Sequence, residues 1–441
     1  MSTDRIGFFR LIQATRSTFN ITHVTTCEAR LLFWSWLYIS ILFISYYILR
    51  PIRDELGVAG GVKNLPWLFT GTLLAMLLVN PLFAWLVKRC SREQFIKLTY
   101  RFFSLHLLIF LAALKFASPE QNVWIGQIFF IWVSVFNLFV VSVFWSFVVD
   151  IFTAEQSKRL FGFLATGATL GGMAGSSLTS GLVDKIGQNG LLLIAMVLIE
   201  CAVFASQRLA KAHNLQGINF THSHKQQPIG GGIFTGVAHT FRSPYLFSIA
   251  LFIFFYSTTS TILYFHQASI AESVFIDRNS RTAFFANIDF WVSVFTLLFQ
   301  LLLTSRILGW LGVAFTLCAL PLISALGFAA LISHSSVTLF IAVQVARRVS
   351  NYALARPARE ILFISVSRED RYKTKHFIDT FVYRAGDQLA SWTYAGFIAA
   401  GLSLSGIAIV AVPFSCLWLG MSIWLGRKHE KYAVINNPEQ H

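Results

Sequence analysis

Two neighbouring apolar stretches in the C-terminal half of the chain carry charged side chains that could bind an anion or move a proton. An ionisable side chain near the middle of a bilayer costs about 2.5–3.5 kcal/mol on insertion scales, so it is retained mainly where it faces a partner or a water-filled cavity. This density of charge therefore indicates a solute pathway. The charged residues are Arg347, Arg348, Arg356, Arg359, Glu360, Asp379, Arg384 and Asp387.

The first of these stretches predicts a polar face with arginine at its centre. With 3.6 residues per turn, four polar side chains project from one side of a helix: Arg348, Asn351, Tyr352 and Arg359. Pro357 predicts a kink beside Arg359. Because arginine presents a planar fork of donors that fits a carboxylate or a phosphate, we expect Arg348, Asn351 and Tyr352 to contact a solute.

The second stretch supplies acidic partners. Its predicted polar face consists of Asp379, Tyr383, Gly386 and Asp387, of which we assign Tyr383 and Asp387 to the solute site. Arg384 can reach Asp387 at three-residue spacing. Since the two helices are consecutive and antiparallel, Arg359 and Glu360 lie at the depth of Asp379. We expect an Arg359–Asp379 ion pair, which is either a static clamp or a gate.

A third polar group lies at the end of the first apolar run, where residues 50–57 are RPIRDELG. Pro51 interrupts the backbone bonding there. Arg53 can receive an anionic solute, or it is a helix-end arginine paired with Asp54. Two acids within apolar runs, Glu200 and Asp289, are candidate carriers of a coupled proton, although a structural role is equally compatible with each position.

Composition defines the class of protein. Of 441 residues, 55% are hydrophobic and 12% are charged, a balance typical of membrane proteins. Five cysteines show no paired spacing, so we expect neither a disulfide frame nor a thiolate metal site. Twelve apolar runs of spanning length predict an all-α polytopic protein, at about 31–49, 65–87, 100–117, 123–149, 160–182, 190–207, 244–268, 283–305, 311–332, 336–363, 376–400 and 404–425.

The twelve runs divide into two sets of six, the two-bundle arrangement of major-facilitator transporters. The expected domains are a cytoplasmic N-terminal segment, a six-helix bundle, a cytoplasmic linker, a second six-helix bundle and a tail, at residues 1–30, 31–207, 208–243, 244–425 and 426–441. Within the first bundle, Gly167, Gly171 and Gly175 recur at fourfold spacing and predict a close contact between helices.

The net charge of +15 reports topology. Most basic residues fall in segments on one side of the predicted membrane, which places both termini in the cytoplasm by the positive-inside pattern. The charge is spread too thinly for nucleic-acid binding. The outer loops carry only Arg50, Arg53, Lys63, Lys115, Lys185, Arg278 and Arg281.

Four segments together resemble the ATP/ADP translocase family of plastids and intracellular bacteria, a distant branch of the major-facilitator fold, and its bacterial members known only as transporters. They are YYILRPIRDELG (46–57), SREQF (91–95), FWSFVVDIFTAEQSKRLFG (144–162) and NYALARPAREILFISVSREDRYKTKHFIDTFVYRAGDQ (351–388). The resemblance implies a lysine at the position of Arg53, an acid within residues 130–140 and a lysine at the position of Asp387. Here the first is still a cation, the acid is missing and the last is reversed, so phosphate recognition there is lost or replaced.

We therefore predict a secondary transporter of the bacterial inner membrane, which moves an anionic or zwitterionic small molecule by alternating access through a central polar cavity. The alternative is a nucleotide exchanger of the ATP/ADP type. A channel is disfavoured by two unlike halves, and an enzyme by the lack of a nucleophile with a base. Expected partners are the solute, a coupling proton or counter-substrate, and membrane lipids, with no nucleic acid and no cofactor.

Overall fold

A computed structural model describes residues 26–89, 92–214, 235–334, 336–363, 366, 374–375 and 377–436. These residues are almost entirely helical, and no strand occurs among them. They form two compact units, which comprise the described parts of Met1–Arg53 with Ala75–Gln226 and of Asp54–Leu74 with Gln227–His441. Most of the predicted N-terminal segment and linker lies outside the described residues, and the predicted six-helix halves remain a prediction.

The described residues from Thr26 to Asn214 form five long helices. They are α2 (Thr26–Ala59), α3 (Leu65–Arg89), α4 (Arg92–Phe116), α5 (Pro119–Ile151) and α6 (Ala154–Asn214), with a short 3₁₀ turn η1 (Val62–Asn64) after α2. Gly187 breaks α6, because its φ of 64° lies in the left-handed region that favours glycine. The element is therefore two consecutive helices.

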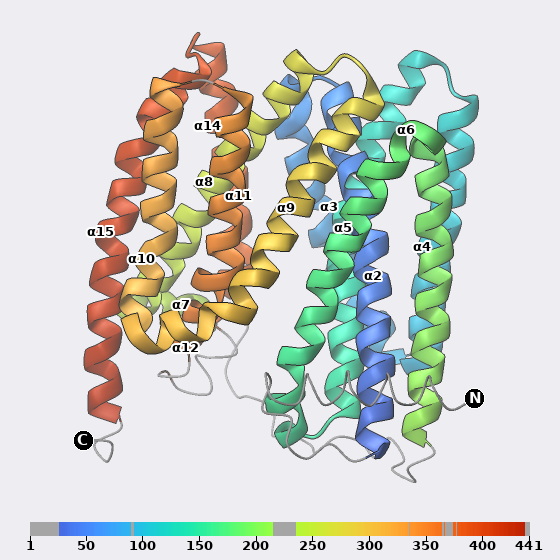
Figure 1. Ribbon diagram of the computed structural model, residues 1–441, viewed down its shortest axis with the longest axis horizontal. Coiled ribbons are helices and arrows are strands. Elements are labelled where there is room, and N and C mark those ends of the chain that lie inside the picture. Colours follow the sequence, from blue (N-terminus) through green and yellow to red (C-terminus); the bar gives the residue numbers. More distant parts are fainter. Residues whose placement is uncertain are drawn as a thin grey trace. The chain divides into compact units, whose positions relative to one another are not determined.

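The remaining helices belong to the second unit, together with the end of α2, η1 and the start of α3. They are α7 (Thr235–Arg242), α8 (Pro244–Val274), α9 (Arg278–Leu302), α10 (Thr304–Ser333), α11 (Val337–Ser350), η2 (Asn351–Ala355), α12 (Arg356–Leu362), η3 (Ile378–Val382), α14 (Tyr383–Ala399) and α15 (Leu404–Asn436). Within this unit, α10 packs along α15 and α8 along α14 (Figure 1).

Nine helices of the described chain are long and apolar enough to cross a membrane. One of them is α6, which the break at Gly187 divides in two. Two further segments, α11 to α12 and η3 to α14, carry the predicted charges and are interrupted by irregular turns. Counting α6 twice and adding these two segments gives the predicted twelve spans. The all-α polytopic fold is confirmed.

The predicted glycine contact is present in the first unit. A Cβ atom added at Gly171 would lie 2.5 Å from the carbonyl oxygen of Ser40 on α2, and one added at Gly175 would lie 2.5 Å from that of Ile44. Such distances are closer than van der Waals contact, so only glycine fits there. The ridge allows the backbones of α6 and α2 to approach closely.

The core of the second unit lies among α8, α10, α12 and α15 around Trp418, which is fully buried. Tyr245 of α8 fixes this packing, since its hydroxyl donates to the Leu362 carbonyl at 3.1 Å and lies 2.9 Å from His429 Nδ1. A buried hydroxyl with both roles satisfied adds directional contacts to an otherwise apolar core. α8 is thereby joined to α12 and to α15.

Both charged stretches contain a π-helical turn, η2 in one and η3 in the other. The prediction of a regular 3.6-residue periodicity through them is therefore wrong. Pro357 explains the first case, because it has no N–H to donate to the Ala353 carbonyl four residues earlier. The hydroxyl of Thr304 donates to that carbonyl instead, at 2.9 Å. Turns of this kind are frequent at functional sites.

Candidate functional site

Arg347, near the end of α11, is the most deeply buried arginine among the described residues of the second unit, with 1% of its surface exposed. Its guanidinium lies over the Tyr256 ring of α8, 5.6 Å from the centroid. Among the described residues, its Nε and Nη1 atoms have no hydrogen-bond partner. An arginine in this condition presents unused donors to whatever enters beside it.

Tyrosine side chains surround this cation. Tyr256 and Tyr383 lie with their ring centroids 6.0 Å apart, and Tyr352 and Tyr383 are close enough to interact electrostatically with Arg347. Asn351 Nδ2 donates to the Tyr256 hydroxyl at 2.9 Å, which sets the orientation of that ring. The structure thus brings the predicted residues Asn351, Tyr352 and Tyr383 together around an arginine that the sequence reasoning did not single out.

Arg384 lies against the other ring of the tyrosine pair. Its guanidinium is 5.8 Å from the Tyr383 centroid, and its Nη1 atom lies 3.3 Å from Asp387 Oδ2, as its three-residue spacing predicts. The side chain is 33% exposed. A buried guanidinium therefore lies over one ring of this tyrosine pair, and a more accessible guanidinium lies over the other ring.

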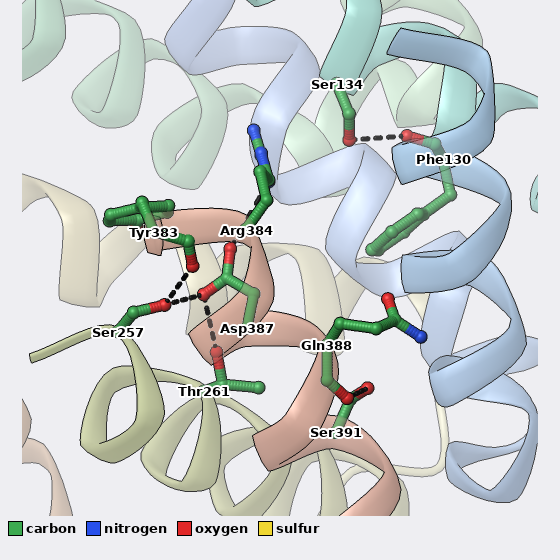
Figure 2. A network of polar contacts seen from close by, with 9 residues as sticks. All are labelled: Phe130, Ser134, Ser257, Thr261, Tyr383, Arg384, Asp387, Gln388 and Ser391. Carbon is green, nitrogen blue, oxygen red and sulfur yellow. Dashed lines mark hydrogen bonds and ion pairs between the residues drawn. The ribbon is translucent and has the colours of Figure 1, made fainter. Parts of the chain in front are cut away.

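Asp387 is held between α14 and α8 (Figure 2). Ser257 and Thr261 of α8 place their hydroxyl oxygens 2.6 and 2.9 Å from its Oδ1 atom. The preceding residue permits this approach, because a Cβ atom at Gly386 would lie 2.9 Å from Ser257 Cβ. The glycine brings the two helices close enough for direct contact.

Arg348 is used differently from its neighbour. Its Nη2 atom lies 2.6 Å from Asp289 Oδ1 on α9, and both side chains are largely buried. The predicted solute contact and the predicted proton carrier are thus the two halves of one ion pair. Removal of one partner of such a buried pair would leave the other as an unpaired buried charge, whereas the roles predicted for the two residues stay predictions.

The predicted contact between Arg359 and Asp379 is present, with 3.3 Å between Nη2 and Oδ1. Glu360 instead pairs with Lys375, at 2.5 Å. These pairs join α12 to the described residues just before α14 in the chain. Their role as a clamp or a gate stays a prediction.

The acids after Arg53 bind helices of the second unit. The Tyr264 hydroxyl donates to Asp54 at 3.0 Å. Glu55 is fully buried and takes two donors from Arg278, at 3.2 and 3.4 Å. These contacts explain why the chain from Asp54 belongs to that unit.

Two predicted residues lie in the first unit. Arg53 has its guanidinium over the Phe130 ring, 5.0 Å from the centroid. Glu200 is an exposed residue of α6. Neither the solute contact predicted for Arg53 nor the proton-carrying role predicted for Glu200 is tested by this geometry.

A short polar run was the signal that sequence reasoning overlooked. Residues 256–261 read YSTTST inside an otherwise apolar helix and provide Tyr256, Ser257 and Thr261. Hydroxyl residues are common in membrane helices, where they usually bond their own backbone, so they carry little weight singly. Arg347 could not be distinguished from Arg348 in the sequence, because the two adjacent arginines differ only in the tertiary contacts that each makes.

A family model, the Major Facilitator Superfamily, matches residues 31–371. The chain therefore belongs to this superfamily and is a multi-pass membrane protein, as predicted.

The predicted similarity to ATP/ADP translocases is confirmed as a distant one. The ADP,ATP carrier protein 1 of Chlamydia trachomatis is 25% identical over 270 residues, which cover 54% of this chain and 50% of the relative. The carrier of the same name from Chlamydia pneumoniae is 22% identical over 222 residues, 45% of this chain and 43% of the relative. The chain spans about half the length of the curated relatives it matches.

Solved structures support the fold. A bacterial homologue of the iron transporter ferroportin, in an inward-facing state, is similar with a TM-score of 0.65 and 12% identity, covering 92% of this chain and 100% of that chain. The POT family transporter PepTSo is similar with a TM-score of 0.60 and 13% identity, covering 93% and 99%. At such identities the likeness concerns the fold alone.

Proposed function

We propose that this protein carries a small anionic or zwitterionic solute across the bacterial inner membrane by alternating access, and that Arg347 receives the negative group. The observation that carries the proposal is the buried guanidinium whose Nε and Nη1 atoms have no partner in the described chain. Burial of an unpaired ion costs several kcal/mol, which a bound anion would offset.

The surroundings of Arg347 favour a carboxylate-bearing solute. Tyr256 and Tyr383 offer flat rings and hydroxyl groups, and Arg384 supplies a second guanidinium over the Tyr383 ring. Such a site combines bidentate recognition of a planar anion with apolar contact to its carbon skeleton. A polycarboxylate, an amino acid or an iron chelate of a polycarboxylate fits this description.

The membrane orientation belongs to the same proposal. The excess of basic residues in alternate loops supports cytoplasmic termini in the bacterial inner membrane. The chain offers no nucleotide-hydrolysis motif, so transport would run on exchange or on an ion gradient. We assign the protein no enzymatic activity.

A thermal-shift screen of the purified protein tests the proposal. The probes are citrate, ferric citrate, succinate, glutamate, ATP and ADP. A ligand at a hundred times its Kd stabilises the folded protein by about 2.7 kcal/mol, so a transported anion should raise the unfolding temperature in a saturable way. Lack of any response to the organic anions, with neutral sugars as the reference, would count against the proposal.

Nucleotide exchange is the second candidate, because the curated relatives are ADP,ATP carriers. We expect no ATP/ADP counterflow. An ionised Asp387 about 4 Å from a phosphate would cost on the order of 4 kcal/mol at an effective dielectric of 20, and a protonated Asp387 offers no cation. Liposomes loaded with ADP and given labelled ATP should stay at background. Robust trans-stimulated uptake would establish the nucleotide reading instead.

Arg53 provides a separate test in the first unit. The Arg53→Ala variant should insert normally but lose uptake of the anion that stabilises the wild-type protein, since the residue is proposed to meet the solute rather than to hold the helices together. Arg53→Lys, which keeps the charge, should retain part of the uptake. Wild-type rates in Arg53→Ala would exclude this role.

A further inference from the structure

The Asp387 carboxyl is 7% exposed and has three polar neighbours (Figure 2). Two are hydroxyl groups on its Oδ1 atom, Ser257 at 2.6 Å and Thr261 at 2.9 Å. The third is Arg384, whose Nη1 atom lies 3.3 Å from Oδ2. The Ser257 hydroxyl lies between Asp387 and a second acceptor, which constrains where the hydrogen atoms of this group can be.

Ser257 has two short oxygen neighbours but only one hydrogen to donate. Its Oγ atom lies 2.6 Å from the Tyr383 carbonyl oxygen as well as 2.6 Å from Asp387 Oδ1. Oxygen atoms this close need a hydrogen between them, and a carbonyl can only accept. The serine hydrogen is therefore committed to Tyr383. The hydrogen between Ser257 and Asp387 must come from the carboxyl itself.

The contact with Arg384 is long enough to leave room for a neutral acid. Charge-assisted bonds between a guanidinium and a carboxylate are about 2.7–2.9 Å long. The Arg348–Asp289 pair, at 2.6 Å, is tight in this sense, whereas the Arg384 contact is 3.3 Å. The Arg359–Asp379 contact is also 3.3 Å long, so the assignment of the proton rests on the two short contacts of Ser257.

No other charged group competes for Asp387 in the described chain. The titratable side chains that interact with it are Arg384 and Tyr383 of its own helix. The titratable side chains of the two elements packed against α14, which are α8 and η3, contact other groups. On η3, Asp379 pairs with Arg359. The contacts on α8 are Tyr245 with His429, Tyr256 with Asn351, Tyr264 with Asp54, His266 with Phe340, and Glu272 with the Val62 amide.

We propose that Asp387 is a proton-binding site, and that its protonation releases Arg384 to bind the anion, so that proton and anion travel together. One proton adds to Oδ1 and donates to Ser257, while the ion pair of Arg384 with the carboxylate is replaced by one of Arg384 with the solute. When the proton leaves, the carboxylate recovers Arg384 and displaces the anion. The coupling, though not the proton site, rests on the proposed anion transport.

Infrared difference spectroscopy of the purified protein tests the proton site without any solute. A pH step from mildly acidic to alkaline buffer should remove the C=O stretching band of a protonated carboxylic acid. The band should be missing from Asp387→Asn and present in Glu360→Gln, which alters an exposed acid paired with Lys375. A band that survives in Asp387→Asn would overturn the proposal.

The direction in which Ser257→Ala shifts the pH of this transition distinguishes the two possible roles of the serine. If Ser257 accepts the carboxyl proton, Ser257→Ala removes that acceptor, and the band should disappear at lower pH than in the wild-type protein. If Ser257 donates to a carboxylate instead, the loss of the donor moves the transition to higher pH. That result would overturn the hydrogen assignment even where Asp387→Asn fails to fold.

Sulfate tests the coupling, because its charge stays constant over this pH range. Sulfate should bind the wild-type protein about 5- to 100-fold more tightly in mildly acidic than in alkaline buffer, the range typical of coupled sites. Asp387→Asn should bind with the tighter affinity at both values. Binding that is independent of pH in the wild type would refute the coupling. Absence of sulfate binding altogether, with the infrared band intact, would contradict the anion site and leave the proton site standing.

Discussion

The Arg347→Gln variant should unfold at a higher temperature than the wild-type protein in the absence of solute, and should no longer be stabilised by the anion. The buried guanidinium has donors without partners among the described residues, so the free protein bears a desolvation cost of several kcal/mol that glutamine largely removes. The same change deletes a hydrogen bond to a charged ligand, worth about 1.5–3 kcal/mol, so affinity should fall about 10- to 150-fold.

The neighbouring arginine is the matched control. Arg348→Gln leaves Asp289 buried without its 2.6 Å partner, and breaking a buried pair costs about 3–5 kcal/mol. Thermal unfolding should therefore respond in opposite directions to two identical substitutions at adjacent positions. If Arg347→Gln destabilises the protein as Arg348→Gln does and still responds to the anion, Arg347 is structural.

A leucine at Gly171 should prevent the first unit from folding. Even its Cβ atom would lie 2.5 Å from the Ser40 carbonyl oxygen and 2.9 Å from Phe43 Cβ, and the backbone of α2 cannot move aside as a flexible side chain can. Overpacking in a tight core costs about 1–3 kcal/mol, and more where it meets backbone. Size-exclusion profiles of the detergent-solubilised protein should show aggregate or no recovery.

Gly181, ten residues further along the same helix, is the control for the change of residue type. A Cβ atom there has no neighbour within 4 Å, so Gly181→Leu should behave as the wild-type protein. A Gly171→Leu variant that is as stable and as well recovered as Gly181→Leu would show that α6 and α2 do not need this close approach.

The fold was predictable because hydropathy alone encodes it. Apolar runs of spanning length are a consequence of bilayer thickness, and the glycine spacing announces close helix contact. Ion pairs between consecutive helices were predictable for a similar reason, since chain order sets the depth at which Arg359 meets Asp379. Connectivity and periodicity suffice for such features.

The site was only partly predictable, because two local facts override periodicity. The π-helical turns change which residues share a face, and in η2 two backbone carbonyls accept from Gln300 and Thr304, which are distant in sequence. Arg347 and Arg348 are the same residue type, yet Arg347 lies over a tyrosine ring, whereas Arg348 pairs with Asp289. Tertiary partners, absent from any local pattern, decide the chemistry of each.

Solute counterflow in proteoliposomes tests the central claim most directly. Vesicles loaded with the unlabelled organic anion that stabilises the protein are given the labelled anion outside. We expect trans-stimulated uptake with the wild-type protein and none with Arg347→Gln, whereas a channel would show no trans-stimulation and an enzyme would convert the label. Uptake without trans-stimulation, or equal counterflow in Arg347→Gln, would contradict an anion carrier built on this arginine.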